Sequence, residues 1–312
     1  MAKAKKNKQA AAKPKAKPRA STSAFSAVSA AERYAQLLAD PCNADLVPSP
    51  IGDGGGSLVV RFERDFIIGN GATETAAALA WCPGEPAVVV PGTALTGEGV
   101  TFSWVTASPV ANFTPGWPFI DVNASQVRCI AACAQVYWPG SELNRQGIIS
   151  MSRAGADTLS TANNQVPTIR STANYIQRTP EGVAEIVWRP NEYDTYYSEP
   201  GAEGFATAIG KKKTALVITG AGLPAAVGLR VRLVAVYEYI PRVESGFKLT
   251  SRGHAGGLTL GSVLNKLDSR GDWMYNAVHT GARIGQAMFG GVGSIASLAN
   301  GAMRIGKMIA SY

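Results

Sequence analysis

Residues 125–151 read SQVRCIAACAQVYWPGSELNRQGIISM, and the fold follows from this stretch. Between Val127 and Trp138 the sequence has no acidic residue and a single basic one, Arg128, so both faces of a strand there would be apolar. Such a pattern is typical of a central strand in two packed sheets. Pro139-Gly140 ends the run, and a second apolar run follows at residues 148–151. The stretch therefore predicts a buried strand, a turn and a second strand.

The rest of the chain also alternates short apolar runs with turns. It has 312 residues, of which 46% are hydrophobic, with 34 Gly and 18 Pro. This composition favours an all-β fold of many short strands joined by turns. Further strands are expected at 57–66, 75–81, 87–90, 100–105, 183–188, 214–219 and 229–240. Their number and spacing predict an eight-stranded antiparallel jelly-roll sandwich, here called the shell domain, over residues 31–245.

A short helix is expected just before the first strand. Within residues 31–39, Tyr34, Leu37 and Leu38 recur at helical spacing, and Asp40-Pro41 then ends the helix. We expect its apolar side to dock on the sandwich.

The positive charge of the chain is concentrated at its N-terminus. The formal net charge is +8, and the first 19 residues hold eight basic residues and no acidic one. Residues 1–30 have almost nothing to bury, so we expect a disordered basic arm that binds a polyanion such as RNA. A tail that only aids solubility or nuclear import would have the same composition. The expected RNA-binding residues are Lys3, Lys5, Lys6, Lys8, Lys13, Lys15, Lys17 and Arg19.

The cysteines indicate synthesis in a reducing compartment. There are four, and the N-terminus shows no apolar secretory leader, so no disulfide framework is expected. Cys129 and Cys133, four apart on one strand, would lie about 13 Å from each other, too far for a bond. With only two histidines in the chain, a zinc site is not expected either.

The C-terminal part changes character after a Gly-rich linker at residues 246–261. Residues 284–303 carry no charge, and residues 277–312 contain bases but no acid. This pattern favours a partly helical tail with an amphipathic segment that lies at a membrane surface, because its many small residues make it only weakly hydrophobic. The alternative is a helix packed beneath the shell domain.

Motifs for catalysis are missing. Residues 204–211, GFATAIGK, have the wrong glycine spacing for a phosphate-binding loop, and no Gly-x-Ser-x-Gly turn occurs. We therefore expect no enzyme and no cofactor, with one exception. Asp194 and Glu199 in an acid-rich stretch could bind Ca²⁺ between subunits, whereas a solvated loop explains the same residues.

Taken together, these features resemble the single-jelly-roll capsid proteins of small icosahedral positive-strand RNA viruses, especially nodavirus-like and tombusvirus-like ones. The resemblance rests on the basic arm, the helix before DPCNADLVP at 40–48, the strands of 125–151, VAVYEYIP at 234–241 and the small-residue tail. It implies a homo-oligomeric icosahedral shell around viral single-stranded RNA. It also implies a virion protein that is made and assembled in the host cytoplasm.

The resemblance further implies one chemical step, self-cleavage at an Asn–small residue bond with the aid of a buried carboxylate. The chain offers Asn276-Ala277 and Asn300-Gly301, and Asp40 and Asp45 precede the first strand as the family's acid does. Cleavage would free a membrane-active peptide, here within 277–312. Two other classes fit the residues: a cellular nucleic-acid-binding β-sandwich without closed assembly, and a membrane-damaging or lectin-like sandwich.

Overall fold

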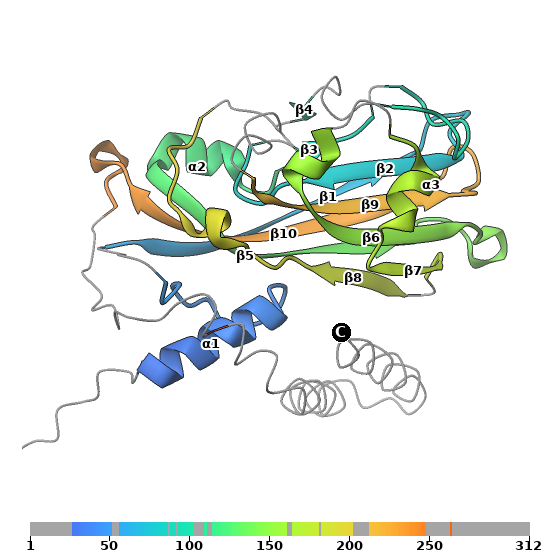
Figure 1. Ribbon diagram of the computed structural model, residues 1–312. Coiled ribbons are helices and arrows are strands. Elements are labelled where there is room, and N and C mark those ends of the chain that lie inside the picture. The colour runs from blue at the N-terminus through green and yellow to red at the C-terminus, as the bar shows by residue number, and fades with distance from the viewer. Residues whose placement is uncertain are drawn as a thin grey trace, which may run out of the picture.

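The chain folds into two antiparallel β-sheets packed face to face (Figure 1). This computed structural model describes residues 27–51, 56–86, 88–91, 93–102, 109–110, 114–160, 164–180, 182–201, 212–247 and 263. The four-stranded sheet has the order β1-β10-β5-β8, formed by Leu58–Ile68, Leu229–Pro241, Ala124–Tyr137 and Val183–Val187. The six-stranded sheet has the order β4-β3-β2-β9-β6-β7, formed by Pro109–Val110, Val88–Val89, Ala76–Trp81, Thr214–Ala221, Ile148–Gly155 and Tyr175–Arg178.

The strand order identifies the fold as a jelly roll. β10 pairs with both β1 and β5, and β9 pairs with both β2 and β6, so late strands lie between early ones in each sheet. Eight strands, β1, β2 and β5 to β10, form this arrangement, and β3 and β4 extend one edge by two residues each. The predicted all-β jelly-roll sandwich is confirmed.

The strand predicted first, β5, lies at the centre of the four-stranded sheet and is buried on both faces. Val127, Ala132, Ala134 and Val136 point to the six-stranded sheet and are fully buried in the core. The opposite face of β5 is covered in part by helix α1, Ala27–Ala39. β5 therefore has no solvent-facing side over most of its length, which explains its continuous apolar sequence.

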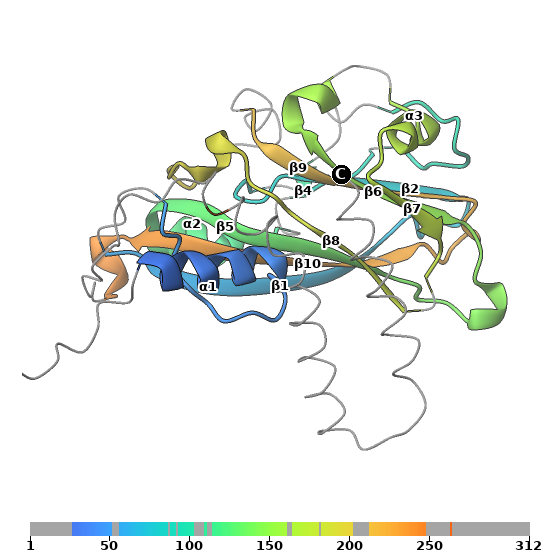
Figure 2. The same ribbon diagram turned by 60° about the horizontal axis from the view of Figure 1, so that its bottom comes forward.

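Helix α1 packs on the outer face of the four-stranded sheet (Figure 2). It begins four residues earlier than predicted, but the expected apolar side is correct, because Tyr34, Leu37 and Leu38 are all buried. Burying one leucine side chain contributes about 1.5–3 kcal/mol, so these contacts hold the helix firmly.

A β-bulge in β5 lies on the surface against which α1 packs. Val236 of β10 is opposite Ala131, whereas Tyr237 is opposite Cys129, so Ile130 has no partner on β10. Ile130 and Ala131 both belong to the cluster beneath α1, and the Tyr34 hydroxyl donates to the Ile130 carbonyl at 2.9 Å. The bulge thus supplies two neighbouring apolar side chains and one free carbonyl to the helix.

Shorter elements cover the remaining surfaces. Helix α3, Val166–Ser171, packs with residues from 95–102 on the outer face of the six-stranded sheet, and α2, Trp117–Asn123, lies at one end. Four 3₁₀ helices complete the described elements: η2 at Glu142–Asn144, η3 at Ala156–Ser160, η4 at Glu192–Thr195 and η5 at Val243–Ser245.

Within the described ranges, no helix combines the length and the apolar content needed to cross a bilayer.

Candidate functional site on the outer face of the four-stranded sheet

Both terminal segments join the body on one face, the outer face of the four-stranded sheet. Helix α1 starts at Ala27, directly after the basic arm, and it packs on this face. Val263 is fully buried in the same apolar cluster. The eight predicted RNA-binding residues, both candidate cleavage bonds and the segment 277–312 lie outside the described residues. The outer face therefore carries the first described residues after the basic arm and the one described residue beyond position 247, Val263.

A buried ion pair lies at one end of this face. Arg128 of β5 and Glu238 of β10 are 2.7 Å apart, and their side chains are 3% and 0% exposed. The Arg128 guanidinium also donates to the carbonyls of Ile51 and Thr195, at 2.8 and 3.0 Å, while Glu238 accepts from the Ser57 hydroxyl. The pair thereby fastens the segment before β1 and the loop after β8 to the sheet.

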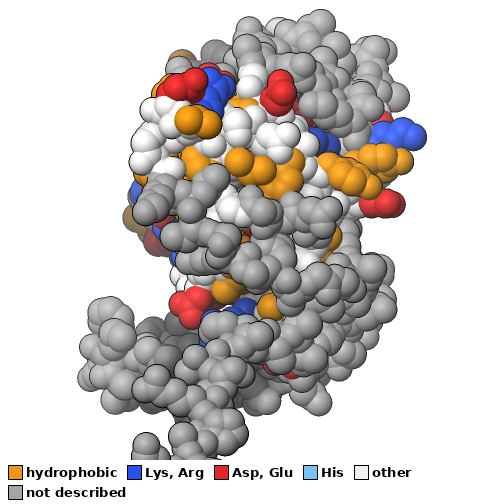
Figure 3. Space-filling model, turned by 90° about the vertical axis from the view of Figure 1, so that its left-hand side faces the viewer, with side chains coloured by type: hydrophobic (Ala, Val, Ile, Leu, Met, Phe, Trp, Pro, Cys, Tyr) orange, Lys and Arg blue, Asp and Glu red, His pale blue; other side chains and the backbone are white. Residues whose placement is uncertain are grey.

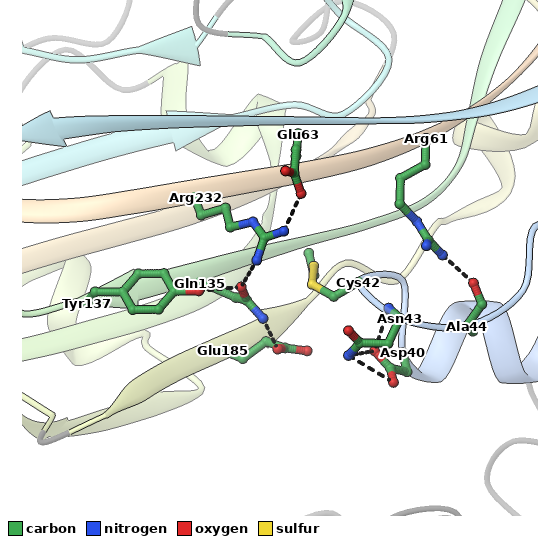
Figure 4. The surroundings of a disulfide bond; sticks show 11 residues. Asp40, Cys42, Asn43, Ala44, Arg61, Glu63, Gln135, Tyr137, Glu185 and Arg232 are labelled. Atoms are coloured by element: carbon green, nitrogen blue, oxygen red, sulfur yellow. Dashed lines mark hydrogen bonds and ion pairs between the residues drawn. A yellow bond between two sulfur atoms is a disulfide. The ribbon is translucent and has the colours of Figure 1, made fainter. Parts of the chain in front are cut away.

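An exposed polar network occupies the other end of the face (Figure 4). Arg232 is hydrogen-bonded to Glu63, which raises the pKa of the guanidinium. The Gln135 amide donates to Glu185 at 2.7 Å and accepts from the Tyr137 hydroxyl at 2.7 Å. The surrounding protein partly removes the Glu185 carboxylate from solvent, and this desolvation raises its pKa.

These charges nearly cancel, so the exposed part of the outer face is not a basic patch. The acidic side chains of Glu63, Asp65 and Glu185 lie beside Arg230 and Arg232, and two of the acids are paired with these arginines. The described outer face therefore has no basic patch that would add to the positive charge of the arm.

A disulfide bond joins Cys42, in the turn after α1, to Cys133 of β5 (Figure 4). The expectation of no disulfide was wrong. It considered only Cys129 and Cys133, which share a strand, whereas the fold brings together cysteines 91 positions apart. A signal was present, because Cys42 follows the predicted docking helix and Cys133 belongs to the strand beneath it. Cys82 and Cys129 are free and buried, and this burial raises the pKa of both thiols.

The disulfide has an acidic neighbour. The two sulfur atoms and a carboxylate oxygen of Glu185 all lie within 4.8 Å of one another, the one such group of three potential metal ligands among the described residues. Because the two sulfurs are bonded to each other, they are not the thiolates that zinc requires.

The carboxylates expected to assist self-cleavage are not buried. Asp40 is half-buried and accepts hydrogen bonds from the Asn43 backbone and side-chain N–H groups, so it stabilises the turn after α1. Asp45 is exposed. The buried acids in the described ranges are Glu85, Asp194 and Glu238. Because the candidate cleavage bonds are not described, self-cleavage stays a prediction.

Of the two candidate calcium ligands, Asp194 has structural partners. Its carboxylate accepts from the backbone N–H groups of Asn191 at 2.8 Å and Thr214 at 3.2 Å, which caps η4 and joins it to β9. Burial raises the pKa of Asp194, and the buried Lys213–Glu85 pair, 2.9 Å long, lies nearby. Glu199 is exposed. Calcium binding stays a prediction.

Comparison with solved structures identifies the same fold in virus particles. The infectious bursal disease virus VP2 subviral particle has a TM-score of 0.50 at 9% identity, over 75% of this chain and 92% of that chain. The Gt strain of the same virus gives 0.49 at 10% identity, over 75% and 93%. Tobacco necrosis virus gives 0.41 at 14% identity, over 64% and 90%.

The comparison establishes the fold. No family model and no curated protein sequence matches the chain. At an identity of 9%, the likeness to VP2 concerns the three-dimensional arrangement alone. The chain has the jelly-roll fold of viral capsid proteins, as the sequence predicted, while the nodavirus-like or tombusvirus-like branch stays a prediction.

Proposed function

We propose that this protein is the coat protein of a small icosahedral RNA virus and that copies of it form a closed shell. The observation that carries this proposal is the likeness to the VP2 subviral particle, which extends over 92% of that chain. A shell needs contacts between copies, and exposed apolar side chains favour such contacts. Figure 3 shows hydrophobic side chains among charged ones at the end that carries α2 and η5, where Val122, Val243 and Phe247 are 66%, 98% and 43% exposed.

In this proposal the basic arm binds the RNA that the shell encloses. Residues 1–30 carry all of the net charge, and the remaining 22 basic residues are balanced by 22 acidic ones. A near-neutral body packs against copies of itself without strong repulsion, while the arm neutralises phosphates. Since α1 connects the arm to the outer face of the four-stranded sheet, that face would be directed at the RNA.

The proposal extends to the place of assembly and to cell entry. We place the protein in the virion, with synthesis and assembly in the host cytoplasm. Residues 277–312 would act on a membrane during entry, because they combine basic residues with a long uncharged stretch. A synthetic 277–312 peptide should release dye from anionic vesicles, whereas sealed particles should not. Intact vesicles after peptide addition would reduce this segment to a packing or RNA-contacting role.

Expression of the full chain followed by electron microscopy tests the shell. We expect closed particles that protect RNA from nuclease, and we expect a variant lacking residues 1–20 to assemble with much less RNA. If all eight basic residues contact phosphates, the logarithm of RNA affinity should fall with the logarithm of salt concentration with a slope of about −5 to −6. A monomer that binds nucleic acid without assembling would instead support a cellular β-sandwich.

A further inference from the structure

The disulfide lies at the junction between the arm-bearing segment and the body. Cys42 is half-buried in the turn that follows α1, and Cys133 is fully buried on the outer face of β5. Cys42 comes three positions after the last residue of α1, Ala39. The bond therefore fixes the C-terminal end of α1 to the central strand of the sheet, while the arm continues from the other end of the helix.

The other described contacts between this segment and the sheet are not covalent. The α1 side chains pack on Ile130, Ala131 and Val236, and Tyr34 donates one hydrogen bond to the sheet. Arg61 of β1 donates to the carbonyl of Ala44 in the turn. Contacts of this kind break and re-form together in local opening, whereas a disulfide blocks such opening until it is reduced. As long as the bond is oxidised, it therefore limits local opening of α1 beyond what the non-covalent contacts do.

The Glu185 carboxylate stands beside this bond. One of its oxygens lies within 4.8 Å of both sulfurs, and the hydrogen bond from Gln135 holds the carboxylate in place. Asp40, two residues before Cys42, adds a second negative charge near Glu185, while the Arg232 guanidinium is paired with Glu63 and that of Arg61 is bonded to the Ala44 carbonyl (Figure 4). Disulfides are opened by an attacking thiolate, which is an anion. The surroundings of the bond therefore repel the attacking group.

We propose that Cys42–Cys133 is a redox-sensitive lock on α1 and that Glu185 slows its opening. Two equivalents of a small-molecule thiol, RSH, reduce the bond in two exchange steps. The first thiolate attacks one sulfur to form a mixed disulfide and releases the other cysteine as a thiolate, which takes up a proton. The second RSH releases the remaining cysteine as a thiol, with RSSR as the oxidised product. Closing is the reverse reaction, driven by an oxidised thiol such as RSSR.

The link to RNA rests on the proposed coat function. Particles assembled in a reducing cytoplasm would hold both cysteines as thiols, so the lock would close only after release from the cell. Entry into the next reducing compartment would open it again and would free α1 and the arm. The lock itself is a property of the folded chain and does not require a shell.

Hydrogen exchange of the full-length chain tests the lock. Peptide mapping without reductant should recover a Cys42–Cys133 linked peptide, and separate thiols at both positions would overturn the proposal. After reduction, we expect amides of residues 31–47 to exchange about 10-fold faster or more, with β5 and β10 unchanged. Cys42→Ser should reproduce this state without reductant and should respond no further to it. Equal acceleration throughout the sheet, or none anywhere, would contradict a lock on α1.

The role of Glu185 is tested by the rate of reduction. In Glu185→Gln, which can still accept the Gln135 hydrogen bond, we expect glutathione to reduce the bond about 3- to 10-fold faster at low salt, and high salt should narrow the difference. Glu142→Gln, which removes an exposed glutamate from the β5–β6 turn, is the matched control and should not change the rate. Equal rates in the wild type and Glu185→Gln would remove Glu185 from the proposal. Because particle formation is scored separately by electron microscopy, a failed lock and a failed coat function give different results.

Discussion

The two faces of the four-stranded sheet are built from the same four strands but differ in kind. The buried part of the inner face consists of hydrophobic residues, with Val136, Leu233, Ala235 and Tyr237 fully buried against the six-stranded sheet. The outer face combines an apolar seat for α1, a buried ion pair, a disulfide and an exposed charge network. The inner face therefore determines that the chain folds as a sandwich. The outer face determines what is attached to that sandwich and how firmly.

The strongest test of this difference places one charge on each face. Val136→Asp puts an unpaired carboxylate in the core, and we expect no soluble folded protein, because burying a charge without a partner is prohibitive. Val183→Asp makes the same change at a half-exposed position on β8, paired with Tyr137 of the outer face, and should cost less than about 1 kcal/mol. Circular dichroism shows whether each variant folds, and urea unfolding measures its free energy of unfolding. Normal folding of Val136→Asp would show that Val136 does not lie in the core.

A smaller effect separates the buried and exposed charges of the outer face. Arg128→Ala leaves Glu238 as a buried charge without its ion-pair partner, so we expect a loss of about 3–5 kcal/mol in the free energy of unfolding. Arg230→Ala removes an arginine that is 53% exposed in its pair with Asp65, and should cost at most about 1 kcal/mol. Urea denaturation of both variants gives the comparison. Similar losses would mean that burial of the ion pair carries no extra cost.

The smallest effect is expected within the exposed network. Glu63→Gln removes the charge that is paired with Arg232, and the free energy of unfolding should fall by no more than about 1 kcal/mol. Repeating the urea denaturation at high salt should abolish the difference, because salt screens exposed pairs. A loss above about 2 kcal/mol that persists in salt would show that this network is as important as the Arg128–Glu238 pair.

The sequence predicted most of the fold because the central strands are long and apolar. β5 and β10 have 14 and 13 residues, and both were expected within a few residues of their observed ends. β7 was missed, because Tyr175–Arg178 has only four residues and lies at a sheet edge. In the run expected at 100–105, the described part shows only a bridge from Phe102 to Asn164. Short strands acquire their structure from neighbours, which the sequence pattern does not reveal.

The candidate site was less predictable, because its parts are distant in sequence. Cys42 and Cys133 meet only once the turn after α1 lies on β5, and Arg128 meets Glu238 only through strand pairing. Arg128 was recognised as the single base in an apolar strand, but its partner lies 110 positions away. Periodicity locates elements along the chain, whereas such pairs depend on how the elements are connected.

The pairing of β1 with β10 sets the time at which the protein can fold. β1 ends at Ile68, and its one sheet neighbour, β10, begins at Leu229, so about half of the chain is synthesised between them. At a synthesis rate of about 5–20 residues per second, β1 waits on the order of 10–30 s with its hydrogen-bonding edge unsatisfied. A ribosome-bound chain that stops before β10 therefore cannot complete the four-stranded sheet. Completion of the fold by its last strand restricts complete subunits to chains translated beyond Pro241.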